Sequence, residues 1–133
     1  MKYWLVKSEP QTYSFEDLQK EQQTVWDGIR NYQARNYLKE MERGDKVLFY
    51  HSGKEKRVVG IAEVSKSFFP EPDDASNSWV AVEIKAETPL QKPVTLQQIK
   101  DAEALRDIML VKQSRLSVMP LSGSEYDFIL DIK

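Results

Sequence analysis

Two β-rich segments joined by a short turn place the strongest constraint on how this chain folds. Lys46–Ser52 and Arg57–Phe68 are rich in β-branched and aromatic residues, which favour strands. The four residues between them, Gly53–Lys56, combine a glycine with charged side chains, a composition typical of a turn. Two strands separated by so short a turn pair in antiparallel fashion. The sequence therefore predicts a β-hairpin in the middle of the chain.

Hydrophobic alternation predicts further strands on both sides of this hairpin. Pro10 limits the first of them, because proline fixes φ and lacks an amide donor. A polar, proline-broken loop is expected over residues 69–78. The remaining strands are expected at Lys2–Lys7, Thr24–Trp26, Trp79–Lys85 and Arg115–Met119.

Capping residues predict four helices. Ser14 and Asn31 are suited to begin the first two, and the spacings Thr95–Gln98 and Ser122–Glu125 match the capping box. These signals place helices at 15–22, 32–41, 96–101 and 123–131. Helices inserted between strands, with antiparallel hairpins in the middle, indicate an α+β fold around a small, strongly curved sheet. At 133 residues we expect a single domain, residues 1–133.

The composition excludes several classes of protein. With 41% hydrophobic residues, 30% charged residues and a net charge of −2, it is typical of a soluble globular protein. No apolar run approaches the roughly 20 residues that span a bilayer, and the first residues lack the features of a secretory signal. We therefore expect no membrane contact and a cytoplasmic location. The absence of cysteine excludes disulfides and thiolate chemistry, and with a single histidine no metal or cofactor is expected.

The segment Val25–Asn36 carries the strongest functional signal. It opens apolar, turns at Gly28 and continues into the helix expected at 32–41, with Arg30 just before that helix and Arg35 within it. An aromatic residue before such a turn, here Trp26, can form the wall of a pocket with positive charge at its rim. That combination suits a flat, partly anionic ligand such as a nucleotide. A pI near 5.5 disfavours electrostatic coating of duplex DNA, so any nucleic-acid contact should be local and centred on the pocket.

Five strings of residues are distributed over essentially the whole chain: Tyr3–Pro10, Trp26–Asn31, Phe49–Gly53, Val59–Val64 and Gln113–Val118. Together they resemble the EVE-domain family. Their number and order make the resemblance far more specific than one short motif. The resemblance implies a PUA-like fold, a curved sheet or β-barrel with peripheral helices, related to YTH and ASCH domains.

The same resemblance implies a function. EVE domains are regarded as readers of modified bases, so the expected partner is modified DNA or RNA with a single-stranded or extruded base, and no catalysis is expected. Lys7–Glu9 resembles the loop that borders the YTH pocket, with Trp26 as the cage wall and Asp27 as an acceptor for an exocyclic amine. The expected ligand-binding residues are Ser8, Glu9, Trp26, Asp27, Tyr50 and His51, and the expected phosphate-binding residues are Lys7, Arg30, Arg35 and Arg115.

Several residues have alternative interpretations. Trp4 and Trp79 lie within strand patterns and are expected in the core, whereas Tyr13, Tyr32, Tyr50 and Trp79 all remain candidates for further walls of the cage. A lone histidine at the end of a strand is more often a hydrogen-bonded structural residue than a base. Two functional alternatives also stay open. One is an enzyme acting on a nucleotide or nucleobase through Glu9, Asp27 and His51, and the other is a sensor of a small metabolite that uses the same pocket.

Overall fold

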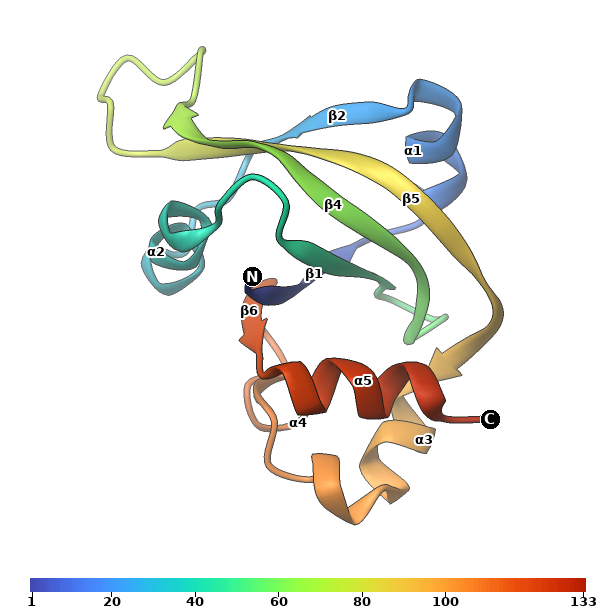
Figure 1. The fold of residues 1–133 in the computed structure, drawn as a ribbon. Coiled ribbons are helices and arrows are strands. Elements are labelled where there is room, and N and C mark those ends of the chain that lie inside the picture. Colours follow the sequence, from blue (N-terminus) through green and yellow to red (C-terminus); the bar gives the residue numbers. More distant parts are fainter.

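The computed structural model describes residues 1–133 and shows a mixed α+β fold around one six-stranded sheet. Figure 1 shows two long strands curving across the molecule, with α3 and α5 gathered at one end and α2 beside the sheet. In chain order the elements are β1 (Tyr3–Ser8), α1 (Phe15–Glu21), β2 (Gln23–Trp26), α2 (Tyr32–Glu40), β3 (Lys46–His51), β4 (Arg57–Pro70), β5 (Val80–Thr95), α3 (Leu96–Asp101), η1 (Glu103–Leu105), α4 (Met109–Lys112), β6 (Val118–Leu121) and α5 (Gly123–Asp131).

The sheet is curved but not closed into a barrel. Its strand order is β2-β5-β4-β3-β1-β6, so β2 and β6 are free edges. Strand β1 pairs in parallel with β3, and every other neighbouring pair is antiparallel. The register between β4 and β5 shifts at four places, and such bulges bend a strand and increase its twist. The predicted central hairpin is confirmed as β3 and β4.

The predicted helix starts are also confirmed. Ser14, Thr95 and Ser122 each accept a hydrogen bond from the third residue of their helix, and that residue's side chain accepts from the cap amide in return. The Asn31 side chain accepts from the amide of Ala34 at 2.9 Å. These local bonds satisfy amides that the first turn of a helix leaves unpaired, which is why short-range spacing sufficed to predict them.

Some predicted boundaries were wrong. Strand β5 continues ten residues past Lys85, because the bulges in its pairing with β4 accommodate a polar segment that contains prolines. The last strand is Val118–Leu121 rather than Arg115–Met119, since the preceding residues form a turn closed by the amide of Leu116 on the carbonyl of Gln113. The helices η1 and α4 were not predicted, and neither has a side-chain cap that would have signalled it.

The core is one cluster of 30 buried residues. Trp4 belongs to it with 2% exposure, as predicted. Its indole nitrogen donates to the carboxylate of Asp45 at 3.0 Å, and Asp45 is itself only 3% exposed. The same carboxylate accepts from the amides of Lys2 and Glu42 at 3.1 and 2.9 Å. Asp45 thus joins β1 to the turn that precedes β3.

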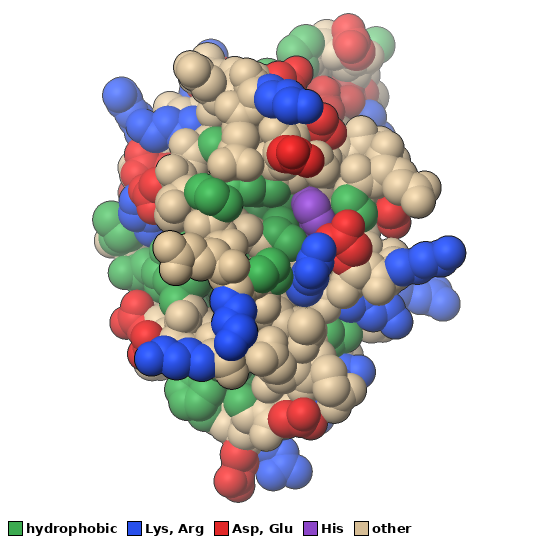
Figure 2. Space-filling model, turned by 90° about the vertical axis from the view of Figure 1, so that its right-hand side faces the viewer, with side chains coloured by type: hydrophobic (Ala, Val, Ile, Leu, Met, Phe, Trp, Pro, Cys, Tyr) green, Lys and Arg blue, Asp and Glu red, His purple; other side chains and the backbone are tan.

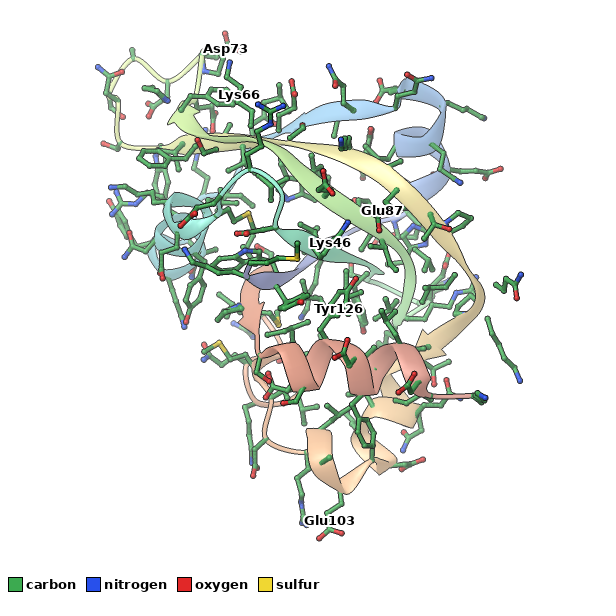
Figure 3. The ribbon with its side chains drawn as sticks, in the orientation of Figure 1. Lys46, Lys66, Asp73, Glu87, Glu103 and Tyr126 are labelled. Atoms are coloured by element: carbon green, nitrogen blue, oxygen red, sulfur yellow. The ribbon has the colours of Figure 1, made fainter.

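Helix α5 packs across the end of β1. The Tyr126 ring lies on that of Tyr3 with centroids 4.5 Å apart, and burial raises the pKa of Tyr126. Figure 3 shows Tyr126 near Lys46 and Glu87, between the sheet and α5. Lys46 forms ion pairs with Glu87 and with Glu63, the latter at 2.9 Å, so opposite charges cover this part of the sheet.

None of the helices has the length and apolar character needed to span a membrane.

Replacing Asp45 with alanine should strongly destabilise the fold. The buried indole nitrogen of Trp4 and two amides would lose their acceptor, and we expect the free energy of unfolding to fall by about 2–4 kcal/mol. Urea unfolding followed by circular dichroism measures this change. Asp127→Ala on the exposed side of α5 is the control and should stay within about 0.5 kcal/mol of wild type. Equal stability of the two variants would contradict the role of Asp45.

Candidate functional site

A cavity of about 460 Å³ opens where the end of β1 meets β2. Four stretches of chain form its wall: the end of β1, the loop after it, β2, and the loop that leads to α2. Five of the ten predicted site residues come together here, namely Lys7, Ser8, Glu9, Trp26 and Asp27. The other lining residues are Thr12, Tyr13, Thr24, Val25 and Ile29.

Trp26 is both a wall of this cavity and an extension of the core. Its ring is half-buried and makes edge-on contacts with Phe49 and Tyr13, with centroids 5.5 and 6.1 Å apart. Trp26 lies on the edge strand β2, and its side chain lines the cavity. Among the aromatic residues considered as further walls, the structure places Tyr13 at the cavity.

The support for Trp26 extends through a column of aromatic rings. Phe49 contacts Phe15 at 5.4 Å between centroids, and Phe15 lies against Gly60 of β4. A Cβ atom added to Gly60 would lie 2.4 Å from the tip of the Phe15 ring, a distance that real contacts do not reach. Only glycine leaves room for Phe15 at this point, and therefore for the column that ends at Trp26.

The polar groups of the cavity differ in how far they are already engaged. The Ser8 hydroxyl donates to the carbonyl of Tyr13 at 2.5 Å, so its oxygen is left to act as an acceptor toward a ligand. The Lys7 ammonium donates to the carbonyl of Ser114 at 2.8 Å, and burial lowers its pKa. The carboxylates of Glu9 and Asp27 belong to exposed residues at the rim.

Tyr13 is held neutral in the cavity wall. Burial, reinforced by the hydrogen bond from its hydroxyl to Glu21, raises its pKa to about 12. The ring therefore presents an uncharged face at neutral pH.

The structure places Tyr50 and His51 on β3, outside the cavity lining. Tyr50 is 3% exposed, and burial raises its pKa to about 12. His51 accepts from the amide of Phe15 through Nε2 at 3.0 Å, and its Nδ1 lies 2.9 Å from Glu55. In the neutral ring the proton must therefore sit on Nδ1. Figure 2 shows this histidine, in purple, between hydrophobic side chains and an acidic one.

The predicted arginines also lie outside the cavity lining. Arg30 forms a two-pronged ion pair with Glu71 at 2.7 and 2.9 Å, and this bond lowers the pKa of Glu71. Arg35 donates to the carbonyl of Ser78 at 3.1 Å. Arg115 is exposed in a separate hollow of about 320 Å³, whose wall includes the Ser114 that binds Lys7.

Trp79 departs from its predicted place in the core. It precedes β5, is only half-buried, and stacks on Tyr32 with centroids 5.0 Å apart. The adjacent Glu71, which is 8% exposed, was not predicted as part of any site. The polar loop in which Glu71 lies did not indicate that this residue is buried, because its burial depends on Arg30, 41 residues earlier in the chain.

One face of the molecule carries charges of both signs. Figure 2 shows lysine and arginine side chains interspersed with aspartate and glutamate on one face of the molecule, without a continuous basic surface there. No group of three or more His, Asp or Glu side chains is placed to hold a metal ion.

Comparison with known proteins identifies close relatives. The family model described as the EVE domain matches residues 2–132. A solved protein from Rhodopseudomonas palustris is 41% identical with a TM-score of 0.95, covering 99% of this chain and 92% of that one. Mouse thymocyte nuclear protein 1 is 36% identical over 98% of this chain and 73% of its own length.

Two further solved structures contain nucleic acid. Human thymocyte nuclear protein 1, solved in complex with DNA containing 5-methylcytosine, is 31% identical with a TM-score of 0.89, covering 98% of this chain and 96% of that one. The YTH domain of the Zygosaccharomyces rouxii MRB1 protein, in complex with N6-methyladenosine RNA, is 19% identical with a TM-score of 0.59 over 97% of this chain and 82% of that one. At that identity the YTH domain shows a shared fold alone.

Replacing Gly60 with alanine should disturb the wall of the cavity through the aromatic column. The added methyl group must displace the Phe15 ring, and we expect a loss of about 1–3 kcal/mol in the free energy of unfolding. The near-ultraviolet circular dichroism of the aromatic residues should change as well. In the control Gly123→Ala, the new Cβ makes an ordinary 3.4 Å contact with Tyr3, so little change is expected. A Gly60→Ala protein with unchanged stability and spectrum would disprove the tight contact.

Proposed function

The chain belongs to the EVE domain family, and on this premise we propose that it is a non-enzymatic reader of modified bases in DNA or RNA. In this proposal, one unpaired or extruded base enters the cavity between β1 and β2 and stacks on Trp26. The observation that carries the proposal is the half-exposed indole on the cavity wall, supported from behind by Phe49. The complex of human thymocyte nuclear protein 1 with methylated DNA supports the same class of ligand.

The cavity is suited to a single base. Its volume of about 460 Å³ lies within the roughly 300–1,000 Å³ range of small-molecule sites. Stacking on an aromatic side chain contributes about 1–3 kcal/mol per base, while extrusion from a duplex costs a few kcal/mol. A base that is already unpaired is therefore the favourable ligand.

The polar rim favours a base with an exocyclic amine. The carboxylate oxygens of Glu9 and Asp27 are hydrogen-bond acceptors, and the Ser8 hydroxyl also offers lone pairs because its proton is engaged by the carbonyl of Tyr13. Cytosine presents an amino group at N4, for which aspartate and glutamate are suitable acceptors. The apolar part of the wall, including Val25 and Ile29, suits a methyl substituent.

The phosphate contacts are proposed at one side of the cavity. Lys7 lines the cavity, and its ammonium donates to the carbonyl of Ser114. Arg115 is the next residue in the chain and therefore adjoins this contact. Arg115 is exposed, and an arginine fork matches two phosphate oxygens. Lys7 and Arg115 are therefore the proposed phosphate ligands, whereas Arg30 is already engaged by Glu71.

Binding is favoured over catalysis by the state of the reactive groups. The enzyme alternative needs His51 as acid or base, but both of its ring nitrogens have partners and it lies outside the cavity lining. The Ser8 hydroxyl proton is directed at a backbone carbonyl, which cannot act as a base. Chromatography of a nucleoside after long incubation with the protein tests this directly: an unchanged nucleoside is expected, and any product would favour the enzyme.

Trp26→Ala should abolish selective binding while the fold persists. Loss of stacking should weaken binding of the preferred modified oligonucleotide by at least about 10-fold and remove its advantage over the unmodified strand. Fluorescence anisotropy measures both, with single-stranded DNA and RNA that carry 5-methylcytosine, N6-methyladenine or no modification. The metabolite-sensor alternative predicts equal affinity for the free nucleoside and the oligonucleotide.

Two controls accompany this variant. Trp26→Phe keeps a stacking ring and should retain part of the selectivity, and Phe68→Ala replaces a large exposed side chain on β4 that is not part of the cavity. Circular dichroism establishes that each variant is folded. Selectivity that survives Trp26→Ala in a folded protein would rule out the proposed pocket, and an unfolded Trp26→Ala protein would assign Trp26 to the core instead.

Arg115→Ala should weaken binding to modified and unmodified strands equally. Loss of one phosphate contact lowers the slope of log affinity against log salt concentration by about 0.7–0.9. Anisotropy titrations at several salt concentrations measure that slope. Arg106→Ala, at another exposed arginine beyond the cavity, is the control and should leave it unchanged. An effect of Arg115→Ala confined to the modified strand would show that Arg115 contacts the base.

A further inference from the structure

A short stack of side chains stands beside the cavity but outside its lining. Arg30 lies over the ring of Trp79 at 5.2 Å, and Trp79 stacks on Tyr32 with an interplanar angle of 27°. Tyr32 is 62% exposed, the largest exposed fraction of any aromatic side chain in the protein. This exposed fraction is high for a ring that already has a stacking partner, and it indicates that part of the other face is open.

The position of Arg35 agrees with an open outer face on Tyr32. Its guanidinium lies 4.8 Å from the Tyr32 centroid and 6.0 Å from that of Trp79. If the guanidinium covered the outer face of Tyr32, it would lie on the opposite side of that ring from Trp79. Its distance from the Trp79 centroid would then approach its distance from Tyr32 plus the distance between the two rings. Arg35 therefore contacts both rings and does not sit on the far side of Tyr32 from Trp79. Its donors reach only neutral oxygens, those of Ser78 and Asn36, so no carboxylate neutralises it directly.

The stack is held in place by the loop between β4 and β5. Glu71 binds Arg30, accepts from the amide of Gly28 at 3.2 Å, and donates its own amide to the carbonyl of Trp79 at 3.0 Å. The Asp74 carboxylate accepts from the amide of Trp79 at 2.8 Å. Trp79 is thus fixed before any ligand arrives, which lowers the entropy lost on binding.

The same contacts couple the stack to the rim of the cavity. Gly28 lies between Asp27 and Ile29, which both line the cavity. Tyr32 follows Ile29 by three residues, so their Cα atoms are at most about 11 Å apart. A strand with one base in the cavity would therefore bring a neighbouring nucleotide within reach of Tyr32.

We propose that the outer face of Tyr32 is a second stacking platform, which takes a base flanking the one held in the cavity while Arg35 faces the intervening phosphate. This inference rests on the proposed function and specifies that the ligand is a strand and not a free nucleoside. A flat π-system is the occupant that fits, because the exposed surface is itself a ring face and the nearest unneutralised charge is a guanidinium. Sequence tolerance is expected, since every base has a face to stack.

The test uses the full chain and two single-stranded DNA oligonucleotides that differ only next to the modified base. Both carry 5-methylcytosine at the centre, and in the second the two flanking positions are abasic, which removes the rings and keeps the phosphates. Wild type should bind the abasic strand about 5- to 150-fold more weakly. Tyr32→Ala should bind the two strands with equal affinity, and Tyr32→Phe should behave like wild type. Affinity for the free nucleoside 5-methyldeoxycytidine should be the same for wild type and Tyr32→Ala.

The other possible results of this test each contradict a particular part of the proposal. Wild type that binds both strands equally, or Tyr32→Ala that remains as sensitive to the abasic sites as wild type, overturns the second platform and leaves the cavity proposal intact. Wild type that binds neither the strands nor the nucleoside overturns the proposal for this base and the platform with it. If Tyr32→Ala instead abolishes self-association in sedimentation velocity, the ring face belongs to an interface with a second copy and the inference is wrong. Phe128→Ala, at another exposed aromatic residue on α5, is the control and should match wild type throughout.

Discussion

The contact between Trp26 and Phe49 is the interaction on which the candidate site depends. Phe49 is fully buried in β3, and its ring bridges Phe15 on one side and Trp26 on the other. The wall of the cavity is therefore the outer end of a column rooted in the core, and its shape is set by packing against Gly60. A wall held in this way needs little ordering on binding, which favours affinity and a fixed ligand orientation.

A buried carboxylate provides the second constraint. Glu71 is almost fully shielded from solvent, and a shielded charge is tolerated only when it is paired and hydrogen-bonded. Arg30 and the amide of Gly28 supply those partners, so the loop before β5 is fixed to the loop after β2. This one pair joins the rim of the cavity to the stack of Trp79 and Tyr32. Rigid loops that carry exposed aromatic rings on an otherwise mixed-charge surface are consistent with local recognition rather than electrostatic coating.

The sequence predictions were accurate where a feature depends on residues close together in the chain, and less accurate where it depends on distant ones. Helix starts at Ser14, Asn31, Thr95 and Ser122 were predicted correctly, because each depends on bonds within four residues. The long extension of β5 was missed, because its pairing with β4 rests on bulges that no local pattern reports. The cavity gathers half of the predicted site residues, those adjacent to the ends of β1 and β2. His51 and Tyr50 were also expected at the site, but both are buried on β3 and neither lines the cavity.

Local patterns in the amino-acid sequence were enough to predict the α+β class, the hairpin, the helix caps, the family and five of the residues that line the cavity. These features follow from local periodicity, capping and matched strings of residues. Three other features could be known only from the folded structure: the parallel pairing of β1 with β3, the stacking of Trp79 on Tyr32 outside the core, and the engagement of Arg30 by Glu71. Each of these depends on contacts between residues more than 40 positions apart, and the burial that drives such contacts is a property of the assembled fold.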